Sequence, residues 1–193
     1  MNGESPMPGI HDARGRRKYL TLEESLRFKE EAMQLDSRNR TLCLLLLCSG
    51  VRVSEALCLK RSDLDLSAGE IIVRTLKQRD SAIYRRIPIP EFLAEEIDGL
   101  KKHPRHRLWK LSRSMAWHIV KNVMRKAEIN GIHATCKGLR HSYGVRSVMM
   151  GVPVTTLQTL MGHRKIETTT IYLNIVGEEL RRVVKVGWDI LFD

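Results

Sequence analysis

The sequence predicts a mainly helical α+β domain with a small three-stranded antiparallel sheet. Most of the chain carries apolar residues at helical spacing, whereas residues 70–88 are rich in β-branched residues that alternate imperfectly with polar ones. No repeat or linker interrupts residues 19–193, and a chain of 193 residues can bury one substantial core. We therefore expect one folded domain over residues 19–193, preceded by a basic, flexible tail over residues 1–18.

The first expected elements are three helices. Thr21 followed by Glu24 is a capping-box pattern for a helix that runs to about Met33. A second helix is expected over about residues 38–48, where a Ser-Gly pair ends it, and a third over about residues 52–59.

The next segment changes to a strand pattern. Residues 70–75 and 82–88 are expected to pair as strands joined by a hairpin loop over residues 76–81. A helix follows over about residues 91–100, and residues 108–110 are the expected third strand. The later helices are expected over about residues 114–129, 138–150 (closed by Gly151), 154–161 (ended by Gly162) and 178–190, with a short helix or turn over residues 168–174.

The charge balance indicates a polyanionic partner. The chain has 33 Lys and Arg against 22 Asp and Glu residues, a formal net charge of +11, and a basic domain of this kind commonly carries a patch for nucleic acid. The alternative is that the basic residues only maintain solubility.

Cysteine usage and hydropathy indicate a reducing, aqueous compartment. The four cysteines include no C-x-x-C pair, and no secretory signal opens the chain. Cys136 lies between His133 and His141, but this spacing matches no common zinc pattern, so no metal site is expected. The longest apolar run is too short to span a membrane. We therefore expect a cytoplasmic protein.

Residues far apart in the chain indicate phosphoryl transfer to a tyrosine. Arg52 begins an apolar helix, where Glu55 can pair with it and hold its guanidinium in place, although such a pair is also common on surfaces. Arg140 offers a planar fork suited to phosphate, His163 follows a helix-ending glycine, and Tyr172 follows nine residues later. Two guanidiniums, an imidazole donor and a phenol nucleophile are what this chemistry needs.

In order and spacing, these motifs resemble the tyrosine recombinase (phage integrase-like) family. Residues 48–65 are similar to the family's first box, and residues 139–143 and 160–163 are similar to its second and third boxes. Tyr172 stands at the nucleophile position, and the similarity extends over residues 19–174. The resemblance implies the fold of that family's catalytic domain.

The resemblance also implies a role for each residue. Arg52 and Arg140 would bind the non-bridging oxygens of the scissile phosphate and stabilise the transition state. His163 would donate a hydrogen bond to the phosphate, and Lys77, in the hairpin loop, would protonate the 5′-oxygen leaving group. Tyr172 would attack phosphorus and form a 3′-phosphotyrosyl bond, with no metal or nucleotide cofactor.

Other residues are expected to support this chemistry. Glu55 and His141 would support the two arginines, and Tyr143 is expected to pack in the core. Arg79 is an alternative to Lys77 as a phosphate contact, but its proton is held too tightly for an acid. Contacts with double-stranded DNA are expected from Arg79, Arg85, Arg86 and Arg164.

The sequence departs from the common family pattern at Lys137, where a histidine is usual. An unperturbed lysine, with a pKa of about 10.4, cannot take the phenol proton at neutral pH, whereas a histidine with a pKa of about 6.5 can. Lys137 is therefore interpreted mainly as a cationic donor to the phosphate, and a role as base stays open. Lysine at this position also resembles the type IB topoisomerases, which gives the main alternative function.

A second departure concerns domain organisation. Residues 1–18 are too few for the helical N-terminal DNA-clamping domain that most family members carry. The helix over residues 178–190 has an apolar stripe that either packs on its own core or docks on a neighbouring protomer, which would build a homo-tetramer on DNA.

These observations predict a DNA strand transferase that acts as a site-specific recombinase or integrase on a mobile element. The expected location is the bacterial cytoplasm, at the nucleoid or a plasmid, and the expected partner is double-stranded DNA. The alternatives are a topoisomerase-like relaxing enzyme and a relative that only binds DNA.

Overall fold

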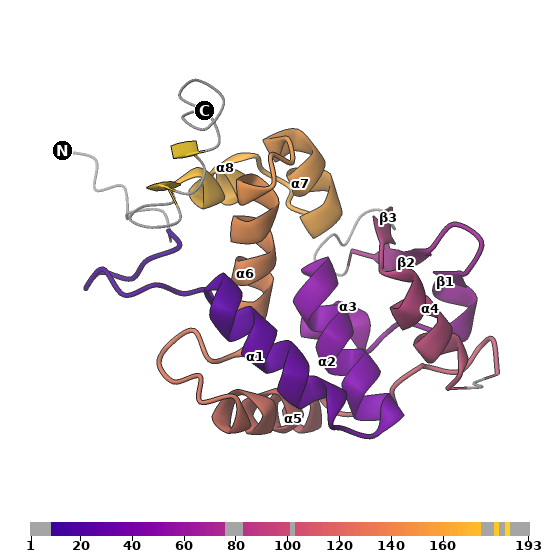
Figure 1. Cartoon of the computed structure of the whole chain (residues 1–193). Coiled ribbons are helices and arrows are strands. Elements are labelled where there is room, and N and C mark those ends of the chain that lie inside the picture. The colour runs from indigo at the N-terminus through magenta and orange to yellow at the C-terminus, as the bar shows by residue number, and fades with distance from the viewer. Residues whose placement is uncertain (1–8, 76–82, 101–102, 175–179, 182–183, 186–193) are drawn as a thin grey trace.

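The computed structural model of the chain describes residues 9–75, 83–100, 103–174, 180–181 and 184–185 (Figure 1). These residues form the predicted α+β fold, with a small antiparallel sheet at one side of the helices. The helices are α1 (Leu22–Met33), α2 (Ser37–Ser49), α3 (Val53–Ala56), α4 (Glu91–Asp98), α5 (Arg113–Lys126), α6 (Cys136–Met149), α7 (Val154–Met161) and α8 (Glu167–Thr170), with 3-10 turns η1 (Arg61–Asp63) and η2 (Ile171–Leu173). The strands are β1 (Leu64–Asp65), β2 (Glu70–Arg74) and β3 (Tyr84–Pro88).

Two adjacent helices organise the middle of the molecule. α1 begins with the predicted capping box, in which the Glu24 backbone N–H donates to Thr21 Oγ1 at 3.2 Å and the Thr21 backbone N–H donates to Glu24 Oε2 at 2.9 Å. α2 is buried on all sides from Leu42 to Leu47, and α1, α4 and α6 pack around it. It ends at Gly50, whose φ of 63° is a left-handed conformation that favours glycine.

The sheet places alternate side chains of β3 on opposite faces. Its strand order is β1-β2-β3, and both pairings are antiparallel. Arg85 and Ile87 face the interior, whereas Tyr84 and Arg86 face solvent. Two neighbouring arginines of the sequence therefore lie in opposite environments.

The predicted third strand at residues 108–110 is wrong, because β1 takes that place in the sheet. Trp109 is fully buried, and its indole N–H donates to the Arg38 carbonyl at 2.9 Å, so this segment packs against the start of α2. The predicted hairpin loop, with Lys77 and Arg79, lies outside the described residues.

Apolar side chains form two clusters. The main core lies between α1, α2, α4, α5 and the sheet, and it includes Phe28, Leu45, Ile87, Trp109 and Val120. A smaller group, which we name the tyrosine cluster, consists of Ile10, Tyr19, Val145, Leu157, Met161, Ile171 and Tyr172.

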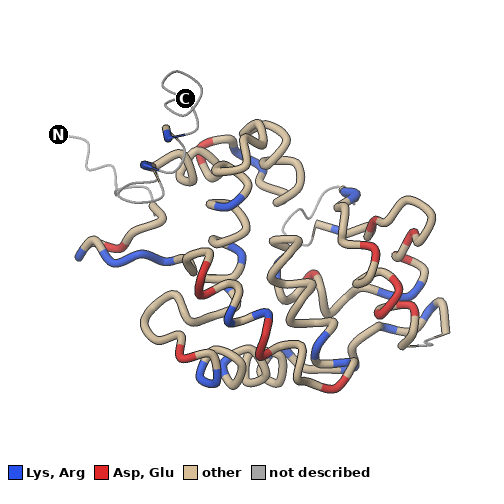
Figure 2. The backbone as a smooth tube through the Cα atoms, viewed as in Figure 1, with Lys and Arg blue, Asp and Glu red and all other residues tan. Residues whose placement is uncertain are grey.

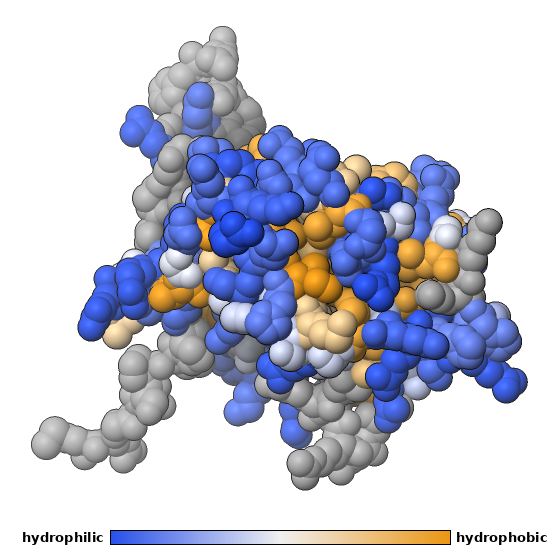
Figure 3. Space-filling model, turned by 90° about the horizontal axis from the view of Figure 1, so that it is seen from below, coloured by the Kyte–Doolittle hydropathy of each residue, from blue (hydrophilic) through white to orange (hydrophobic). Residues whose placement is uncertain are grey.

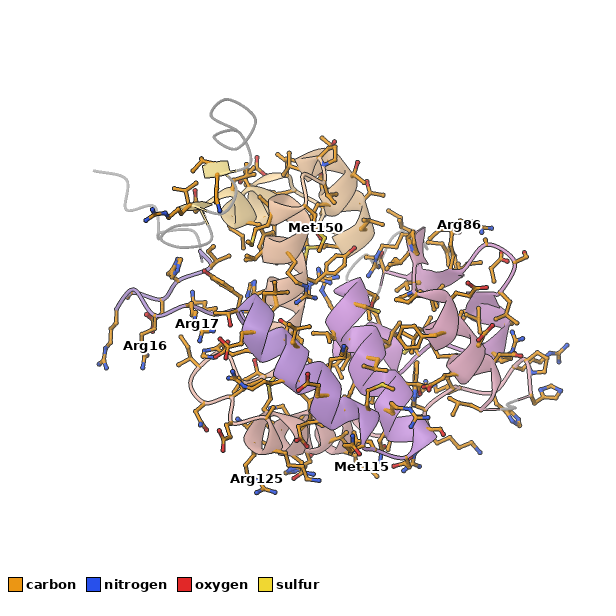
Figure 4. The ribbon with its side chains drawn as sticks, in the orientation of Figure 1. Arg16, Arg17, Arg86, Met115, Arg125 and Met150 are labelled. Carbon is orange, nitrogen blue, oxygen red and sulfur yellow. The ribbon has the colours of Figure 1, made fainter. Side chains whose placement is uncertain are left out.

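The N-terminal segment corrects the expectation of a flexible tail for residues 9–18. Ile10 is only 1% exposed and belongs to the tyrosine cluster. Arg17 forms an ion pair with Glu24, and Lys18 Nζ donates to the Gly9 carbonyl at 3.1 Å. Figures 2 and 4 show the basic residues of this segment, with Arg16 and Arg17 labelled in Figure 4. Residues 1–8 lie outside the described residues.

The C-terminal helix predicted over residues 178–190 falls mostly outside the described residues. Residues 180–181 and 184–185 are helical, and Leu180 and Val184 are 44% and 39% exposed. On the side of α5, the surface is largely hydrophilic, with apolar residues gathered near its middle (Figure 3). Within the described parts of the chain, no helix has the length and apolar character needed to cross a membrane.

Candidate active site

Four of the residues predicted for phosphoryl transfer lie at or around Arg140 of α6, which bonds to the ends of α2 and α7 (Figure 1). Arg52 caps the start of α3, Arg140 lies in the second turn of α6, and His163 follows α7. Tyr172 lies in η2, which packs on α6. A cleft of about 310 Å³ opens beside them, lined by Arg52, Thr75, Gly162, His163, Arg164, Lys165 and Thr168.

Arg52 is held by Glu55, as the spacing predicted. Its Nη1 donates to Glu55 Oε1 at 2.8 Å, and its backbone N–H donates to Glu55 Oε2 at 3.0 Å. The Glu55 side chain is fully buried, whereas the Arg52 side chain is 22% exposed and borders the cleft. No other described residue accepts a hydrogen bond from the Arg52 guanidinium, so N–H groups remain for an anion in the cleft.

Arg140 joins the ends of two helices. Its Nη1 donates to the Gly50 carbonyl at the end of α2, and its Nη2 donates to the Met161 carbonyl at the end of α7 at 2.7 Å. Carbonyls at helix ends lack partners within the helix and carry a negative partial charge, which favours a cation. Burial, and then the charge of Arg52, lower the pKa of Arg140 to about 10, so the guanidinium is charged at neutral pH.

The contacts of His163 define its tautomer. A guanidinium only donates, so His163 Nε2 accepts from Arg140 Nη2 at 2.9 Å. Nδ1 then carries the proton and donates to Thr169 Oγ1 at 2.9 Å. Burial, followed by Arg140 and Arg52, lowers the pKa of His163 to about 3, so the ring is neutral at pH 7. The predicted donation to a phosphate therefore requires Nε2 to gain a proton or the tautomer to change.

Tyr172 is covered in this structure. It is 1% exposed, and its hydroxyl lies 3.2 Å from His141 Nδ1. Its ring is stacked with that of His163, at a centroid distance of 6.4 Å and an interplanar angle of 12°. A Cβ at Gly144 would lie 2.5 Å from Cε1 of the tyrosine, so this face of α6 requires glycine. Burial raises the pKa of Tyr172 to about 12, which keeps the phenol protonated.

His141 contacts the candidate nucleophile itself, which the sequence analysis did not predict. It is 8% exposed, and its Nε2 is buried without a hydrogen-bond partner among the described residues. Burial, and then Lys137 and Arg140, lower the pKa of His141 to about 4. A neutral imidazole therefore lies against the Tyr172 hydroxyl.

Arg85 corrects the expectation that it contacts DNA. It is 5% exposed, and each nitrogen of its guanidinium donates to a protein acceptor. Nη2 donates to Glu55 Oε2 at 2.7 Å, Nη1 donates to Thr75 Oγ1 at 2.9 Å, and Nε donates to the Leu160 carbonyl at 2.9 Å. A guanidinium buried among these acceptors is not on the surface that DNA would reach.

The other predicted residues are exposed or lie outside the described part of the chain. Lys137 is exposed in the first turn of α6, one turn before Arg140. Arg164 is exposed and lines the cleft. The Arg86 side chain is 58% exposed and pairs with Asp65 and Glu70 at 3.2 Å; Figure 4 shows it at the outer side of the sheet. Lys77 and Arg79 are not described.

Sequence reasoning missed two partners in the site. Thr75 and Thr169 bind Arg85 and His163 through their hydroxyls, and no sequence pattern marks them for this. The burial of Arg85 had a signal, because in a strand it shares a face with the apolar Ile87 two residues later.

Comparisons with known proteins agree with this fold. The chain matches the phage integrase family over residues 18–178. It is 36% identical over 177 residues to the tyrosine recombinase XerA of Thermococcus kodakarensis, covering 86% of this chain and 61% of that protein. It is 27% identical over 206 residues to the tyrosine recombinase XerC of Halalkalibacterium halodurans, covering 94% and 67%. The chain thus spans about three fifths to two thirds of the length of these relatives.

Solved structures show the same arrangement of elements. The crystal structure of XerA recombinase superposes with a TM-score of 0.73 at 25% identity, covering 88% of this chain and 64% of that one. The catalytic domain of bacteriophage HP1 integrase superposes with a TM-score of 0.63 at 27% identity, covering 86% and 93%. The fold is that of the catalytic domain of bacteriophage HP1 integrase and of the matching part of XerA. This chain belongs to the phage integrase family.

Proposed function

We propose that this chain is the catalytic domain of a site-specific DNA recombinase, which cleaves and rejoins duplex DNA through a 3′-phosphotyrosyl intermediate on Tyr172. The observation that carries the proposal is the meeting of two arginines, a histidine and a tyrosine beside one cleft. The formal net charge of +11 and membership of the phage integrase family support DNA as the substrate.

The arginines would bind the scissile phosphate from two sides. Arg52 borders the cleft with unused N–H groups, and Arg140 lies behind it with its orientation set by two helix ends. Both guanidiniums would stabilise negative charge as the phosphorus becomes five-coordinate. Loss of one such preorganised donor typically lowers a rate about 10²–10³-fold.

Tyr172 would have to leave His141 before it can attack phosphorus. Its hydroxyl now contacts His141 Nδ1, and its phenol is protonated and covered. In the proposed reaction the phenol passes its proton to water as its oxygen bonds to phosphorus, and the 5′-oxygen leaves with a proton from Lys77. The Tyr172–phosphate bond conserves the energy needed for rejoining, which reverses these steps.

Lys137 would act as a cationic donor to the phosphate. Its exposed position one turn before Arg140 supports this role, since residues three apart share a helix face. Arg86 and Arg164, which are also exposed, would contact the DNA backbone. Glu55 would fix Arg52 in place.

Assembly on DNA is proposed to be tetrameric, through the C-terminal helix. Leu180 and Val184 are four residues apart and exposed, which supports docking of their apolar side chains on a neighbouring protomer. We further propose that the catalytic domain begins near residue 19 and acts in the bacterial cytoplasm, at the nucleoid or a plasmid.

A suicide DNA substrate tests the proposal. The substrate carries a candidate recombination site and a nick next to the cut, so that the 5′-hydroxyl diffuses away and the covalent intermediate accumulates. A protein–DNA adduct on a denaturing gel that disappears in Tyr172→Phe is the expected result. No adduct on DNA that the protein demonstrably binds would contradict the proposal.

The two alternative functions make different predictions with the same protein. A topoisomerase-like enzyme would relax supercoiled plasmid without exchanging strands between two sites. A relative that only binds DNA would shift the DNA in a salt-sensitive manner and form no adduct. Strand exchange between two sites, detected by the lengths of the products, would favour the recombinase over both.

A further inference from the structure

Arg85 bonds to three separate parts of the candidate site. Its Nη2 contacts the Glu55 carboxylate on α3, its Nε contacts the Leu160 carbonyl on α7, and its Nη1 contacts the Thr75 hydroxyl at the end of β2. The arginine itself lies on β3, three residues from the nearest undescribed part of the chain. One buried side chain thus connects the sheet to α3 and α7.

The first connection concerns the charge beside Arg52. Glu55 is one buried carboxylate shared by two guanidiniums: Oε1 accepts from the Arg52 guanidinium, and Oε2 accepts from Arg85 as well as from the Arg52 backbone N–H. Burial raises the pKa of Glu55, but the bond and charge of Arg85, with the contacts of Arg52, outweigh burial and hold the pKa below its usual value. Without Arg85, Oε2 would be free to accept from the Arg52 guanidinium as well, and a bidentate pair would draw that guanidinium away from the cleft.

The second connection concerns the turn before His163. Gly162 has a left-handed φ of 64°, and a Cβ there would lie 2.9 Å from Arg85 Nη1 and 3.0 Å from its Cζ. The guanidinium therefore packs directly on the backbone that precedes His163. The adjacent Leu160 and Met161 carbonyls accept from Arg85 and Arg140, so the two arginines together hold the end of α7.

The third connection concerns the base of the hairpin. Thr75 is 3% exposed, and its backbone N–H donates to the Ile83 carbonyl at 2.9 Å. This bond lies one residue beyond Arg74 and Tyr84, the last residues that pair between β2 and β3. Its hydroxyl accepts from Arg85, and Thr75 also lines the cleft. Lys77, the proposed acid, follows Thr75 by two residues.

We propose that Arg85 is a positioning residue of the strand-transfer site, which sets the Arg52 guanidinium through Glu55 and fixes the end of α7 before His163. This inference rests on the proposed function. Arg85 touches no substrate; it acts by keeping the Arg52 guanidinium bonded to Glu55 through Nη1 alone and directed to the cleft. A displacement of about 1 Å in such a group can lower a rate about 10²-fold.

Arg85→Lys is the most direct variant, because it keeps the charge beside Glu55 but loses the planar fork that reaches three acceptors. At saturating DNA, we expect single-turnover cleavage of the suicide substrate to fall roughly 10–100-fold. DNA affinity should stay within about twofold, because the buried guanidinium does not contact DNA. Arg125→Lys, at an exposed position of α5, is the control and should cleave within about twofold of the wild type.

A double-mutant cycle separates positioning from a loss of folded structure. If Arg85 acts through Arg52, Arg85→Lys should cost roughly threefold or less when Arg52→Ala is already present. The same large factor in both backgrounds would overturn the inference. Thermal unfolding and circular dichroism of each variant give the folded fraction used to normalise the rates.

A milder variant covers the case in which Arg85→Lys does not fold. Thr75→Val keeps the shape of the side chain and removes the acceptor of Arg85 Nη1. It should slow cleavage roughly 3–10-fold in the wild-type background and much less in the Arg52→Ala background. Wild-type cleavage that neither Arg85→Lys nor Thr75→Val reduces would overturn the inference alone, whereas absence of an adduct with the wild type would overturn the proposed function and the inference with it.

Discussion

The main core and the tyrosine cluster hold different parts of the candidate site. Arg52 extends from α3, which packs on β2 and α2 beside the main core, with Glu55 and Arg85 buried beneath it. Tyr172 belongs to the tyrosine cluster, which is built from the N-terminal segment, α6, and the short elements α7 and η2. Arg52, one of the two proposed phosphate ligands, is thus set beside the larger core.

This difference suggests how a covered nucleophile can be released. A small cluster formed by short elements can open locally at a lower free energy than a large core of long helices. Tyr172 can therefore move toward the cleft while Arg52 and Glu55 stay in place. Arg140 joins the two regions, because its acceptors are the carbonyls of Gly50 and Met161.

The largest effect is expected where the two regions meet. Arg140→Ala should lower single-turnover cleavage at least about 10²–10³-fold, because it removes a preorganised phosphate donor and the bond that fixes the end of α7. The rate is measured with the suicide substrate at saturating DNA. Arg125→Ala, on the far helix α5, is the control, and equal rates for both variants would place the phosphate elsewhere.

Cavity variants in each cluster sharpen the comparison. Leu45→Ala, at a fully buried position of the main core, should lower the free energy of unfolding by about 2–5 kcal/mol. Leu157→Ala, in the tyrosine cluster, should lower the free energy of unfolding less than Leu45→Ala does. For each kcal/mol of stability lost, it should slow cleavage more than Leu45→Ala does. Urea unfolding and adduct formation measure the two effects. If the loss of cleavage rate divided by the loss of unfolding free energy is the same for both variants, the two clusters open as one unit.

Acidic pH should lower the free energy of unfolding, because His141 and His163 beside Tyr172 are held neutral in the folded protein. His141 and His163 have folded pKa values of about 4 and 3, below the ordinary value of 6.5, so the unfolded chain binds protons that the folded chain refuses. Their contribution to stability is present above pH 6.5 and is lost as the pH falls through the folded values. The loss is at most about 1.4 kcal/mol per pH unit for each group, and less for partly exposed ones.

Replacing one histidine checks this assignment. In His141→Gln, the free energy of unfolding should fall less between pH 7 and pH 5 than in the wild type, because one group no longer takes up a proton on unfolding. Urea titrations at both pH values give the comparison. If the free energy of unfolding falls as much between pH 7 and pH 5 in this variant as in the wild type, His141 does not contribute to the pH dependence.

The smallest effect is expected at Arg86. Its side chain is 58% exposed and pairs with two surface carboxylates, so Arg86→Met should change the free energy of unfolding by less than about 1 kcal/mol. Thermal unfolding measures this change. A larger loss would mean that the outer face of the sheet contributes to the site as strongly as the inner face does.

Sequence patterns predicted the fold where local rules decide it. The capping box at Thr21, the left-handed glycines that end α2 and α7, and the pairing of Arg52 with Glu55 depend on residues close in the chain. The third strand was misplaced, because Leu64–Asp65 is too short for a periodic pattern. Burial of Trp109 against Arg38 is a long-range contact that local spacing does not encode.

The sequence indicated which candidate residues the structure brings together, but not the groups that support them. The residue types and their order indicated Arg52, Arg140, His163 and Tyr172, whereas backbone carbonyls that hold a guanidinium leave no trace in a sequence. Arg85 was interpreted from charge alone, although its alternation with Ile87 places it inside. The contact of His141 with Tyr172 depends on how η2 folds back on α6.

Mapping the covalent bond tests the central claim most directly. The wild-type adduct formed on the suicide substrate would be digested with nuclease and protease, and tandem mass spectrometry would locate the deoxynucleotide remnant. The account predicts a 3′-phosphate ester on Tyr172, absent from the Tyr172→Phe protein. A remnant on Tyr143, Tyr84 or any residue other than Tyr172 would contradict it.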